Sequence, residues 1–261
     1  MKRNGLRQLY ESKKLGIGML IGLPTPAIVD MAGCAGLSYV TLDTEHCSYD
    51  LSVLENMVSA ADARGVATLV RLYGPDPYMI AKVLDIGVDG LKFSKVETRK
   101  DAENIVRYCR LPPHGERSPE PSTRSAGYGT FARDEYNRLA NETVVVVGID
   151  TRKGLDNVDE IVNVPGVDAV SVGPSDMSWS LGVAKDSPEF ADAVRRIHKS
   201  TQAAGKTSIG IVYSPDQIGE WLQRDPNIRV YQWAADRMNI TRFLQEGVNR
   251  GKAVAAKYVN D

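Results

Sequence analysis

The feature that most constrains the fold is an alternation, repeated along the whole chain, of a short apolar segment with a longer amphipathic one. Each apolar segment has the length of a buried strand, and each amphipathic segment carries apolar residues at helical spacing. Such a rhythm predicts parallel strands joined by helices. The expected strands are Ile17–Ile21, Tyr39–Leu42, Ala67–Arg71, Gly90–Phe93, Val144–Ile149, Ala169–Val172, Ser208–Val212 and Ile228–Gln232.

The expected helices fill the intervals between these strands. They are Pro26–Ala35, Asp50–Ala63, Asp76–Ile86, Lys100–Cys109, Gly154–Val162, Ser187–Ala204, Pro215–Leu222 and Asn239–Lys257. Because no linker interrupts the rhythm, we expect an α/β protein with one closed (β/α)8 TIM barrel as a single domain over residues 1–261. An open doubly wound sheet is the alternative, but the Gly-x-Gly-x-x-Gly turn typical of that fold is absent.

The balance of charge excludes several classes of partner. The formal net charge is −1, and acidic and basic residues are interspersed, so neither nucleic acid nor an anionic membrane surface is expected as a partner. No apolar run approaches the roughly 20 residues of a membrane span, and Leu6–Lys14 is too polar for a signal peptide. The three cysteines, Cys34, Cys47 and Cys109, lack CxxC spacing, which indicates reduced thiols in a cytoplasmic protein.

Charged residues and glycine gather where the expected strands end. The C-terminal ends of the strands share one face of a barrel, and barrel enzymes keep their chemistry there. The residues concerned are Asp43, Glu45 and His46 after the second strand, Arg71 at the third, Asp150 at the fifth, and Gly173-Pro174-Ser175-Asp176 after the sixth. The sequence therefore predicts a site at this rim.

These residue types suit metal-assisted proton transfer. Histidine moves protons near neutral pH, which makes His46 a candidate acid or base beside two carboxylates. Asp150 and Asp176 could supply oxygen ligands to Mg²⁺ or Mn²⁺, or could instead be N-caps of the helices that follow. Arg71 could clamp a carboxylate or an enolate, or could pair with Asp43 or Glu45.

Three further features have competing interpretations. Lys92 and Lys95 flank the end of the fourth strand and could form a Schiff base with a 2-oxo acid, although solvated lysines are commoner. Cys47 could be a nucleophile but is more simply an incidental thiol. The long segment Leu111–Arg133 carries Arg117, Arg124 and Arg133, and a loop of this length inside a compact domain is often functional.

Several blocks of sequence occur in one order over nearly the whole chain: Leu42-Asp43-Thr44-Glu45-His46, Val70-Arg71, Leu84-Asp85-Ile86-Gly87, Ile149-Asp150-Thr151-Arg152, Pro165-Gly166-Val167-Asp168 and Val172-Gly173-Pro174-Ser175-Asp176-Met177-Ser178. Together these blocks resemble the HpcH/HpaI aldolase family, the metal-dependent class II pyruvate aldolases. The family includes 4-hydroxy-2-oxoheptanedioate and 2-dehydro-3-deoxyglucarate aldolases, with macrophomate synthase and a siderophore-pathway citrate synthase as relatives.

The resemblance implies a barrel of the phosphoenolpyruvate/pyruvate-binding type and a role for each matching residue. A divalent ion, Mg²⁺ or Mn²⁺ with Co²⁺ as a further candidate, would be held by Asp150 and Asp176. Arg71 would hold the pyruvate oxygen, and His46 with Asp43 would move the proton. The substrate carboxylate would bind at Gly173, Ser175 and Asp176, where a helix N-terminus offers free amides.

The resemblance also implies an assembly of several copies. The family usually forms a hexamer, a trimer of dimers, whose C-terminal helix is exchanged between neighbours. The helix at 239–257 is therefore expected at a subunit interface. Asp85 matches an aspartate that reaches the site of a neighbouring subunit, and Glu45 is expected in the same supporting shell.

The sequence departs from the family pattern in the metal shell and in the substrate loop. Asp150 stands where the family normally has glutamate, and Gly148 stands where it usually has glutamine. Ser94 and Lys95 replace a proline-containing strand end. Gly115–Ser118 replaces a Gly-x-Arg-Gly block, and Pro119–Pro121 follows in place of small residues. These departures indicate an altered substrate, metal affinity or reaction.

The expected activity is that of a carbon–carbon lyase that forms a metal-bound pyruvate enolate from a 4-hydroxy-2-oxo acid or oxaloacetate. The partners would be a small 2-oxo acid and an aldehyde or other electrophile. A condensing or decarboxylating biosynthetic enzyme on the same scaffold is one alternative. A Schiff-base aldolase and a non-catalytic barrel that binds 2-oxo acids are the others.

Overall fold

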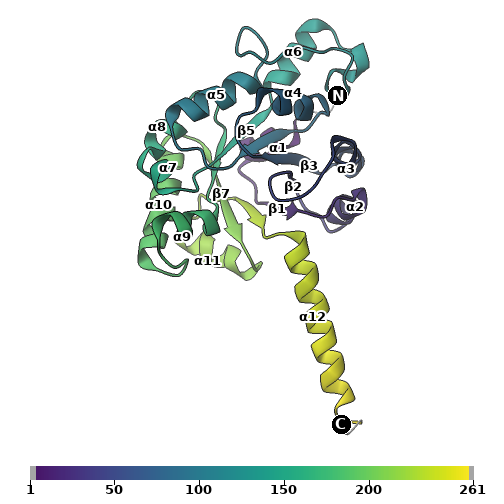
Figure 1. Ribbon diagram of the computed structural model, residues 1–261, viewed down its shortest axis with the longest axis vertical. Coiled ribbons are helices and arrows are strands. Elements are labelled where there is room, and N and C mark those ends of the chain that lie inside the picture. Colours follow the sequence, from purple (N-terminus) through teal and green to yellow (C-terminus); the bar gives the residue numbers. More distant parts are fainter. Residues whose placement is uncertain (1–3, 259–261) are drawn as a thin grey trace.

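The structure, a computed structural model, describes residues 4–258 and contains a closed barrel of parallel strands paired in sequence order from β1 to β8 and back to β1 (Figure 1). The expected (β/α)8 TIM barrel is confirmed. Of the expected domain 1–261, residues 1–3 and 259–261 lie outside the described part. The strands are β1 Gly16–Ile21, β2 Tyr39–Asp43, β3 Ala67–Leu72, β4 Gly90–Phe93, β5 Val144–Gly148, β6 Ala169–Ser171, β7 Thr207–Val212 and β8 Val230–Trp233.

Every expected strand is present, and the largest shift is at β8. This strand begins at Val230 and not at Ile228. The backbone N–H of Ile228 still donates to the carbonyl of Asp225, and the carboxylate of Asp225 accepts the N–H of Asn227. A turn that is held in this way continues through Ile228, which delays the start of the strand.

The helices lie outside the barrel, except for an N-terminal helix beneath it (Figure 1). They are α1 Gly5–Ser12, α2 Pro26–Cys34, α3 Leu51–Arg64, α4 Pro77–Asp85, α5 Arg99–Cys109, α6 Arg133–Asn141, α7 Arg152–Asp156, α8 Val158–Val162, α9 Pro174–Leu181, α10 Pro188–Ala203, α11 Asp216–Arg224 and α12 Asp236–Ala255, with a 3-10 helix η1 at Arg124–Gly129.

Two expected helix boundaries are wrong. The predicted helix Gly154–Val162 is two short helices, α7 and α8, because Asn157 leaves helical geometry and its side chain donates to the carbonyl of Glu97. The last helix begins at Asp236, three positions before the predicted Asn239, and its helical hydrogen bonds end before the predicted Lys257.

The predictions missed α1, α6, α9 and the 3-10 helix η1. In α6 most side chains are charged or polar, and only Tyr136 and Ala140, one turn apart, are buried. That pattern is too sparse to stand out as a helical stripe. In α9 the helix starts at Pro174 directly after the rim segment, so the residues that suggested a site also form its first turn.

The lower half of the barrel interior is filled by apolar side chains. Leu6 of α1 enters it from below and packs in one buried cluster with Tyr39, Leu69, Val144 and other strand residues. The Tyr39 ring occupies the space that a Cβ at Gly18 would need, since that atom would lie 2.4 Å from the ring. The interior is therefore closed at the N-terminal end of the strands.

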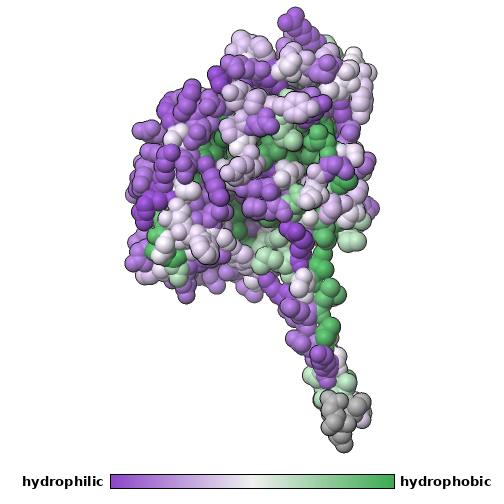
Figure 2. Space-filling view, viewed as in Figure 1, coloured by the Kyte–Doolittle hydropathy of each residue, from purple (hydrophilic) through white to green (hydrophobic). Residues whose placement is uncertain are grey.

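Helix α12 projects away from the barrel (Figure 1). Figure 2 shows hydrophobic residues along the part of this helix nearer the barrel. Its exposed large apolar residues are Met238, Ile240, Phe243, Leu244, Val248 and Val254. Among residues 4–258, no helix is both long and apolar enough to cross a membrane.

Candidate active site

Three charged side chains stand side by side at the mouth of the barrel because of strand register. Asp43 of β2 is the register partner of Arg71 of β3, which is in turn the partner of Lys92 of β4. Side chains at paired positions of neighbouring strands point to the same face of the sheet. Lys92 is the partner of Val146, whose side chain belongs to the interior cluster, so this face is the barrel interior.

Asp43 and Arg71 form a bidentate ion pair. The guanidinium Nε donates to Oδ1 over 2.9 Å and Nη2 donates to Oδ2 over 2.7 Å, while the two side chains are 3% and 15% exposed. Burial alone would raise the pKa of Asp43, but the Arg71 guanidinium outweighs that effect and holds the pKa below its usual value. The pair fixes the planar guanidinium at the mouth.

Asp43 also shapes the loop that carries His46. Its Oδ1 accepts the backbone N–H groups of Glu45 and His46, at 3.1 and 3.2 Å. The imidazole itself is 62% exposed, and its Nε2 lies 4.0 Å from Oε1 of Glu45. The resemblance implied that Asp43 works with His46 in moving the proton. The structure instead places this carboxylate on the backbone of His46 and on Arg71.

Glu45 extends the same network on the other side of Arg71. Its side chain is only 5% exposed, its Oε2 lies 3.4 Å from Nε of Arg71, and it accepts the hydroxyl of Ser94 over 2.6 Å. Ser94 was noted in the sequence only as a departure from the family pattern. Its hydrogen bond to Glu45 depends on the fold, which places the end of β4 beside the loop after β2.

Asp150 is buried at the end of β5 and is held by two backbone groups. Its Oδ2 accepts the N–H of Lys95 over 2.9 Å, and its Oδ1 accepts the N–H of Gly173 over 2.6 Å. Burial raises the pKa of Asp150, and the nearby charge of Asp176 adds to the rise. The position at residue 148 has no side chain, and Asp150 occupies the space: a Cβ at Gly148 would lie 2.6 Å from Oδ2.

Asp176 lies in the first turn of α9 at the rim. Its Oδ1 is 3.3 Å from Nζ of Lys95, and both side chains are more than two-fifths exposed. Lys95 adopts a left-handed backbone with φ of 55°, which is uncommon for a residue with a side chain. This conformation directs its N–H to Asp150 while its side chain reaches Asp176. The hydroxyl of the neighbouring Ser175 accepts from Lys185.

The carboxylates of Asp150 and Asp176 both lie near one point, as two ligands of a divalent ion would. A Cβ built at Gly173 would lie 2.9 Å from Oδ1 of Asp150 and 3.6 Å from Oδ2 of Asp176. Gly173 thus leaves open a space lined by two acidic groups. No cluster of three or more His, Cys, Asp or Glu suited to a metal occurs among residues 4–258. Two carboxylates nevertheless fit Mg²⁺, which keeps several waters and takes substrate oxygens.

The alternative that these aspartates are N-caps is wrong. The N-cap of α7 is Thr151, whose hydroxyl accepts the N–H of Gly154. The N-cap of α9 is Gly173, and no side chain caps that helix. Neither carboxylate is therefore explained by helix capping.

Cys47 lies against the Asp43 carboxylate but is not an activated thiol. Its Sγ is 3.4 Å from Oδ2 of Asp43. Burial raises the pKa of this thiol to about 11, and the charge of Asp43 contributes. A thiol in this state is protonated at neutral pH, which agrees with an incidental cysteine and not with a nucleophile.

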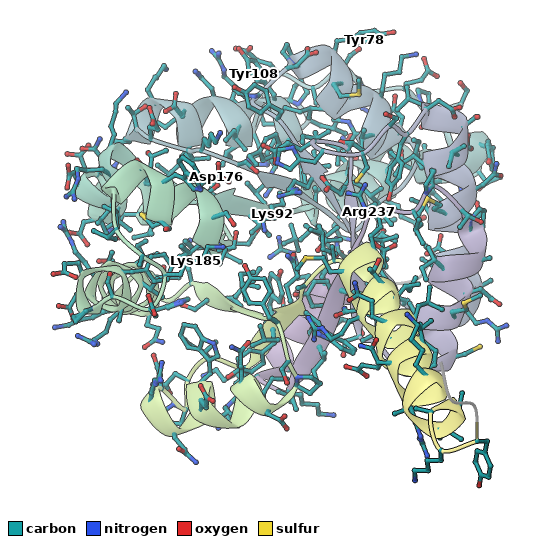
Figure 3. The ribbon with its side chains drawn as sticks, turned by 60° about the horizontal axis from the view of Figure 1, so that its bottom comes forward. Tyr78, Lys92, Tyr108, Asp176, Lys185 and Arg237 are labelled. Carbon is teal, nitrogen blue, oxygen red and sulfur yellow. The ribbon has the colours of Figure 1, made fainter. Side chains whose placement is uncertain are left out.

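Two residues at the start of α12 were missed. Asp236 is buried, and its carboxylate accepts the N–H groups of Gly22 and Leu23, at 2.9 and 3.0 Å. Arg237 donates to Sγ of Cys47 over 2.9 Å. The sequence signal that could have identified Asp236 and Arg237 is an acidic and a basic residue shortly after the last expected strand. Figure 3 shows Lys92, Asp176 and Arg237 around the same opening.

Asp85 and the arginines of the long segment lie elsewhere in this chain. Arg117 is buried and pairs with Asp85 over 2.7 Å, and Arg124 pairs with Asp62 over 2.6 Å. Both arginines line a cavity of about 390 Å³ with Ala67, Asp89 and Thr143, residues at or just before the starts of β3 to β5. Arg117 and Arg124 therefore sit at the end of the barrel opposite its mouth, away from the candidate site of their own chain.

Comparison with known proteins places this geometry in a family context. A 5-keto-4-deoxy-D-glucarate aldolase of Escherichia coli O139:H28 is 33% identical over 208 residues, which cover 78% of this chain and 80% of the relative. A crystal structure of an HpcH/HpaI aldolase/citrate lyase family protein from Burkholderia cenocepacia J2315 matches with a TM-score of 0.88 at 25% identity, covering 95% of this chain and 99% of that one.

A second solved structure broadens the chemistry found on this scaffold. The citrate synthase SbnG matches with a TM-score of 0.86 at 25% identity, covering 95% of this chain and 97% of that one. The sequence model of HpcH/HpaI aldolase/citrate lyase matches residues 17–239, from β1 into α12. The chain belongs to the HpcH/HpaI aldolase/citrate lyase family.

Proposed function

We propose that this protein is a carbon–carbon lyase that converts a 4-hydroxy-2-oxo acid into pyruvate and an aldehyde, or oxaloacetate into pyruvate and carbon dioxide. The observation that carries the proposal is the buried Asp43–Arg71 pair at the same mouth as Asp150 and Asp176. Both reactions leave an electron pair on the carbon next to the 2-oxo group. This pair moves onto the 2-oxo oxygen, which gives an enolate. A fixed guanidinium suits that intermediate, and the acidic rim beside it would hold a divalent cation that also favours negative charge on the oxygen.

Asp150 and Asp176 are the proposed ligands of a divalent ion, Mg²⁺ or Mn²⁺, with Co²⁺ as a further candidate. The space at Gly173 between the two carboxylates supports this assignment. When bound, the ion would act as a Lewis acid on the 2-oxo group. The open position at Gly173 and the free first-turn amides of Ser175 and Asp176 suit the substrate carboxylate, because a helix N-terminus favours an anion.

Arg71 is the proposed donor to the enolate oxygen. Asp43 holds its guanidinium through two hydrogen bonds, so the donor is already oriented before the substrate binds. Preorganised donors stabilise charge that develops during a reaction without the cost of reorienting. Asp43 is therefore a positioning residue in this mechanism.

His46 is the proposed acid and base. Its exposed imidazole stands over the mouth beside Glu45, where it can take the proton of the 4-hydroxyl group during cleavage and return it to the carbon of the enolate, directly or through water. Glu45 would stabilise the imidazolium. Asp85 lies at the other end of its own barrel, so its proposed role is in the site of another copy.

Condensation is the reverse of the cleavage step and uses the same enolate. The likeness to a citrate synthase favours this as the second candidate function. The enolate carbon would then attack an acyl or aldehyde acceptor that enters from the open side of the mouth.

The experiment that tests the proposal is oxaloacetate decarboxylation by protein stripped with EDTA, assayed with and without added Mg²⁺ or Mn²⁺. We expect pyruvate formation that the metal restores. A panel of 4-hydroxy-2-oxo acids assayed in parallel would identify the aldehyde. No pyruvate from any substrate with any metal would overturn the proposed function.

The apolar side of α12 supports a homo-oligomer. Ile240, Leu244 and Val248 repeat at four-residue intervals, so they share one face of the helix, and all are exposed. Exposed apolar surface of this kind indicates an interface, and a second copy is its proposed partner. Light scattering should report an oligomer, a hexamer in the expected case, for the wild type and a smaller species for Leu244→Asp/Val248→Asp. The control is Gln245→Asp.

A further inference from the structure

Lys92 occupies an unusual place for a lysine. It lies in the middle of β4, is only 6% exposed, and stands in register between Arg71 and Val146 inside the barrel. Figure 3 shows it at the mouth, between Asp176 and Arg237. The proposed mechanism assigns it no part.

The Lys92 ammonium has no partner in the part of the chain that the structure describes. No side chain of residues 4–258 hydrogen-bonds to it, and no carboxylate lies within ion-pair distance. The neighbouring cations differ: Arg71 is paired with Asp43, and Lys95 with Asp176. Burying a charge without a partner is costly, so a group outside the chain is the natural candidate to complete it.

The surrounding carboxylates already have other partners. Asp43 binds Arg71, Glu45 binds Ser94 and approaches Arg71, and both oxygens of Asp150 accept backbone N–H groups. These three acids act on Lys92 only at longer range, and they oppose the effects of burial and of Arg71, which lower its pKa to about 8. At neutral pH the group is still mostly an ammonium, so it can attract an anion.

We propose that Lys92 is an additional substrate-binding residue, whose ammonium takes an anionic oxygen of the 2-oxo acid beside Arg71. The inference rests on the proposed function, because it assumes a 2-oxo acid in the mouth. The register pairing places two cations side by side on the interior face, one already oriented by Asp43 and one without a partner. A small planar anion can contact both cations at once, because Arg71 and Lys92 are register partners on the same face of neighbouring strands.

The consequence for the reaction is additional stabilisation of the enolate. As the carbon–carbon bond breaks, its electron pair moves onto the 2-oxo oxygen, and the proton of the 4-hydroxyl leaves to the base. A second buried cation close to that oxygen lowers the energy of the charged intermediate more than an exposed one would, because little water screens it.

The test measures binding of oxalate, a planar dianion that resembles the pyruvate enolate, to metal-free protein by calorimetry. Lys92→Met should weaken oxalate binding at least about tenfold, and Lys92→Gln should do the same. The matched control, Lys82→Met, removes an exposed lysine of α4 and should leave the affinity within about twofold. The melting temperature of Lys92→Met should equal or exceed that of the wild type, because an unpartnered buried charge has been removed.

Two results would overturn the proposal. Unchanged oxalate affinity in both Lys92 variants would exclude an anion contact. A borohydride-stable pyruvate adduct on Lys92, found by peptide mass spectrometry, would make it a covalent nucleophile and not an ammonium ligand. Neither readout requires turnover, so a failure here can be told apart from a failure of the proposed lyase activity.

Discussion

Gly148 and Asp150 share one space at the end of β5. A Cβ on Gly148 would lie 2.6 Å from Oδ2 of Asp150 and 3.1 Å from the carbonyl of Phe93. The carboxylate folds into the room that residue 148 leaves empty and is fixed there by the N–H groups of Lys95 and Gly173. The two departures from the family pattern, at 148 and 150, are thus one structural change.

Gly148→Ala should therefore act on the metal shell and not only on packing. The added methyl group must displace the Asp150 carboxylate, and we expect metal affinity or turnover to fall about 10- to 100-fold. Calorimetry with Mn²⁺ would measure it. Gly219→Ala in α11 is the control, since a Cβ there meets nothing within 4 Å. A Gly148→Ala protein with wild-type metal affinity would mean that the carboxylate is not a ligand.

Arg71→Lys should lower kcat much more than it lowers the melting temperature. Lysine keeps the charge but cannot form both hydrogen bonds to Asp43, so the donor loses its orientation. A fall of roughly 10²- to 10³-fold in pyruvate formation is expected. The matched control is Arg64→Lys, which breaks an equivalent two-bond pair with Asp30 on the exposed surface. Equal activity losses in the two variants would remove Arg71 from the mechanism.

Asp176→Asn should weaken metal binding with little effect on folding. The side chain is partly exposed, and its one ionic partner is Lys95, so the substitution removes charge without leaving a buried group unpaired. We expect Mn²⁺ affinity to fall at least about tenfold, as seen by calorimetry or by electron paramagnetic resonance. Asp186→Asn, at another aspartate of the chain, provides the comparison. Retained affinity would refute the ligand assignment.

His46→Ala should slow turnover while leaving metal binding intact. An acid or base of this kind typically contributes about 10²- to 10⁴-fold. The imidazole is 62% exposed and makes no hydrogen bond that supports the fold, so the melting temperature should not change. Unchanged turnover would exclude His46.

The buried His198 should make the protein less stable in acid, independently of the candidate active site. It is buried in α10, its ring packs edge-on against Trp221, and burial lowers its pKa to about 4 while Asp225 opposes the shift. The unfolded chain takes up this proton below its ordinary pKa of about 6.5, whereas the folded chain stays neutral. The stabilisation is complete above pH 6.5 and is lost as the pH falls towards 4, by about 3 kcal/mol.

The measurement is urea unfolding at several pH values for the wild type and His198→Phe. The variant keeps a buried aromatic ring but cannot take up a proton. Its stability should decline less between pH 6.5 and 4 than that of the wild type. Parallel curves for the two proteins would contradict the assignment.

Periodicity predicted the barrel because apolar strand segments alternate along the chain with segments of helical spacing. It failed for the short α1 before the first strand and for helices that contribute little to the core. The charged α6 buries only Tyr136 and Ala140, and the start of α9 is governed by a rim loop. The break at Asn157 depends on a hydrogen bond to Glu97, sixty positions away, which local sequence does not encode.

The positions of the candidate residues were predictable from the sequence, but their contacts were not. Strand ends placed Asp43, Arg71, Asp150 and Asp176 at one rim, yet the register that pairs Asp43 with Arg71 is a property of the closed sheet. Lys92 could have been located earlier. Its neighbours Leu91 and Phe93 are apolar and buried in the layer between strands and helices, so alternation alone turns Lys92 into the barrel.

Leu6 and Tyr39 fill the barrel interior at the N-terminal end of the strands, so the barrel is open at one end only. A substrate that enters by the mouth must leave by it. Under the proposed mechanism, the aldehyde would form on the outer side and leave first, and pyruvate, bound between Arg71 and the acidic rim, would leave last. We therefore expect ordered product release, in which pyruvate competes with the intact substrate for the free protein.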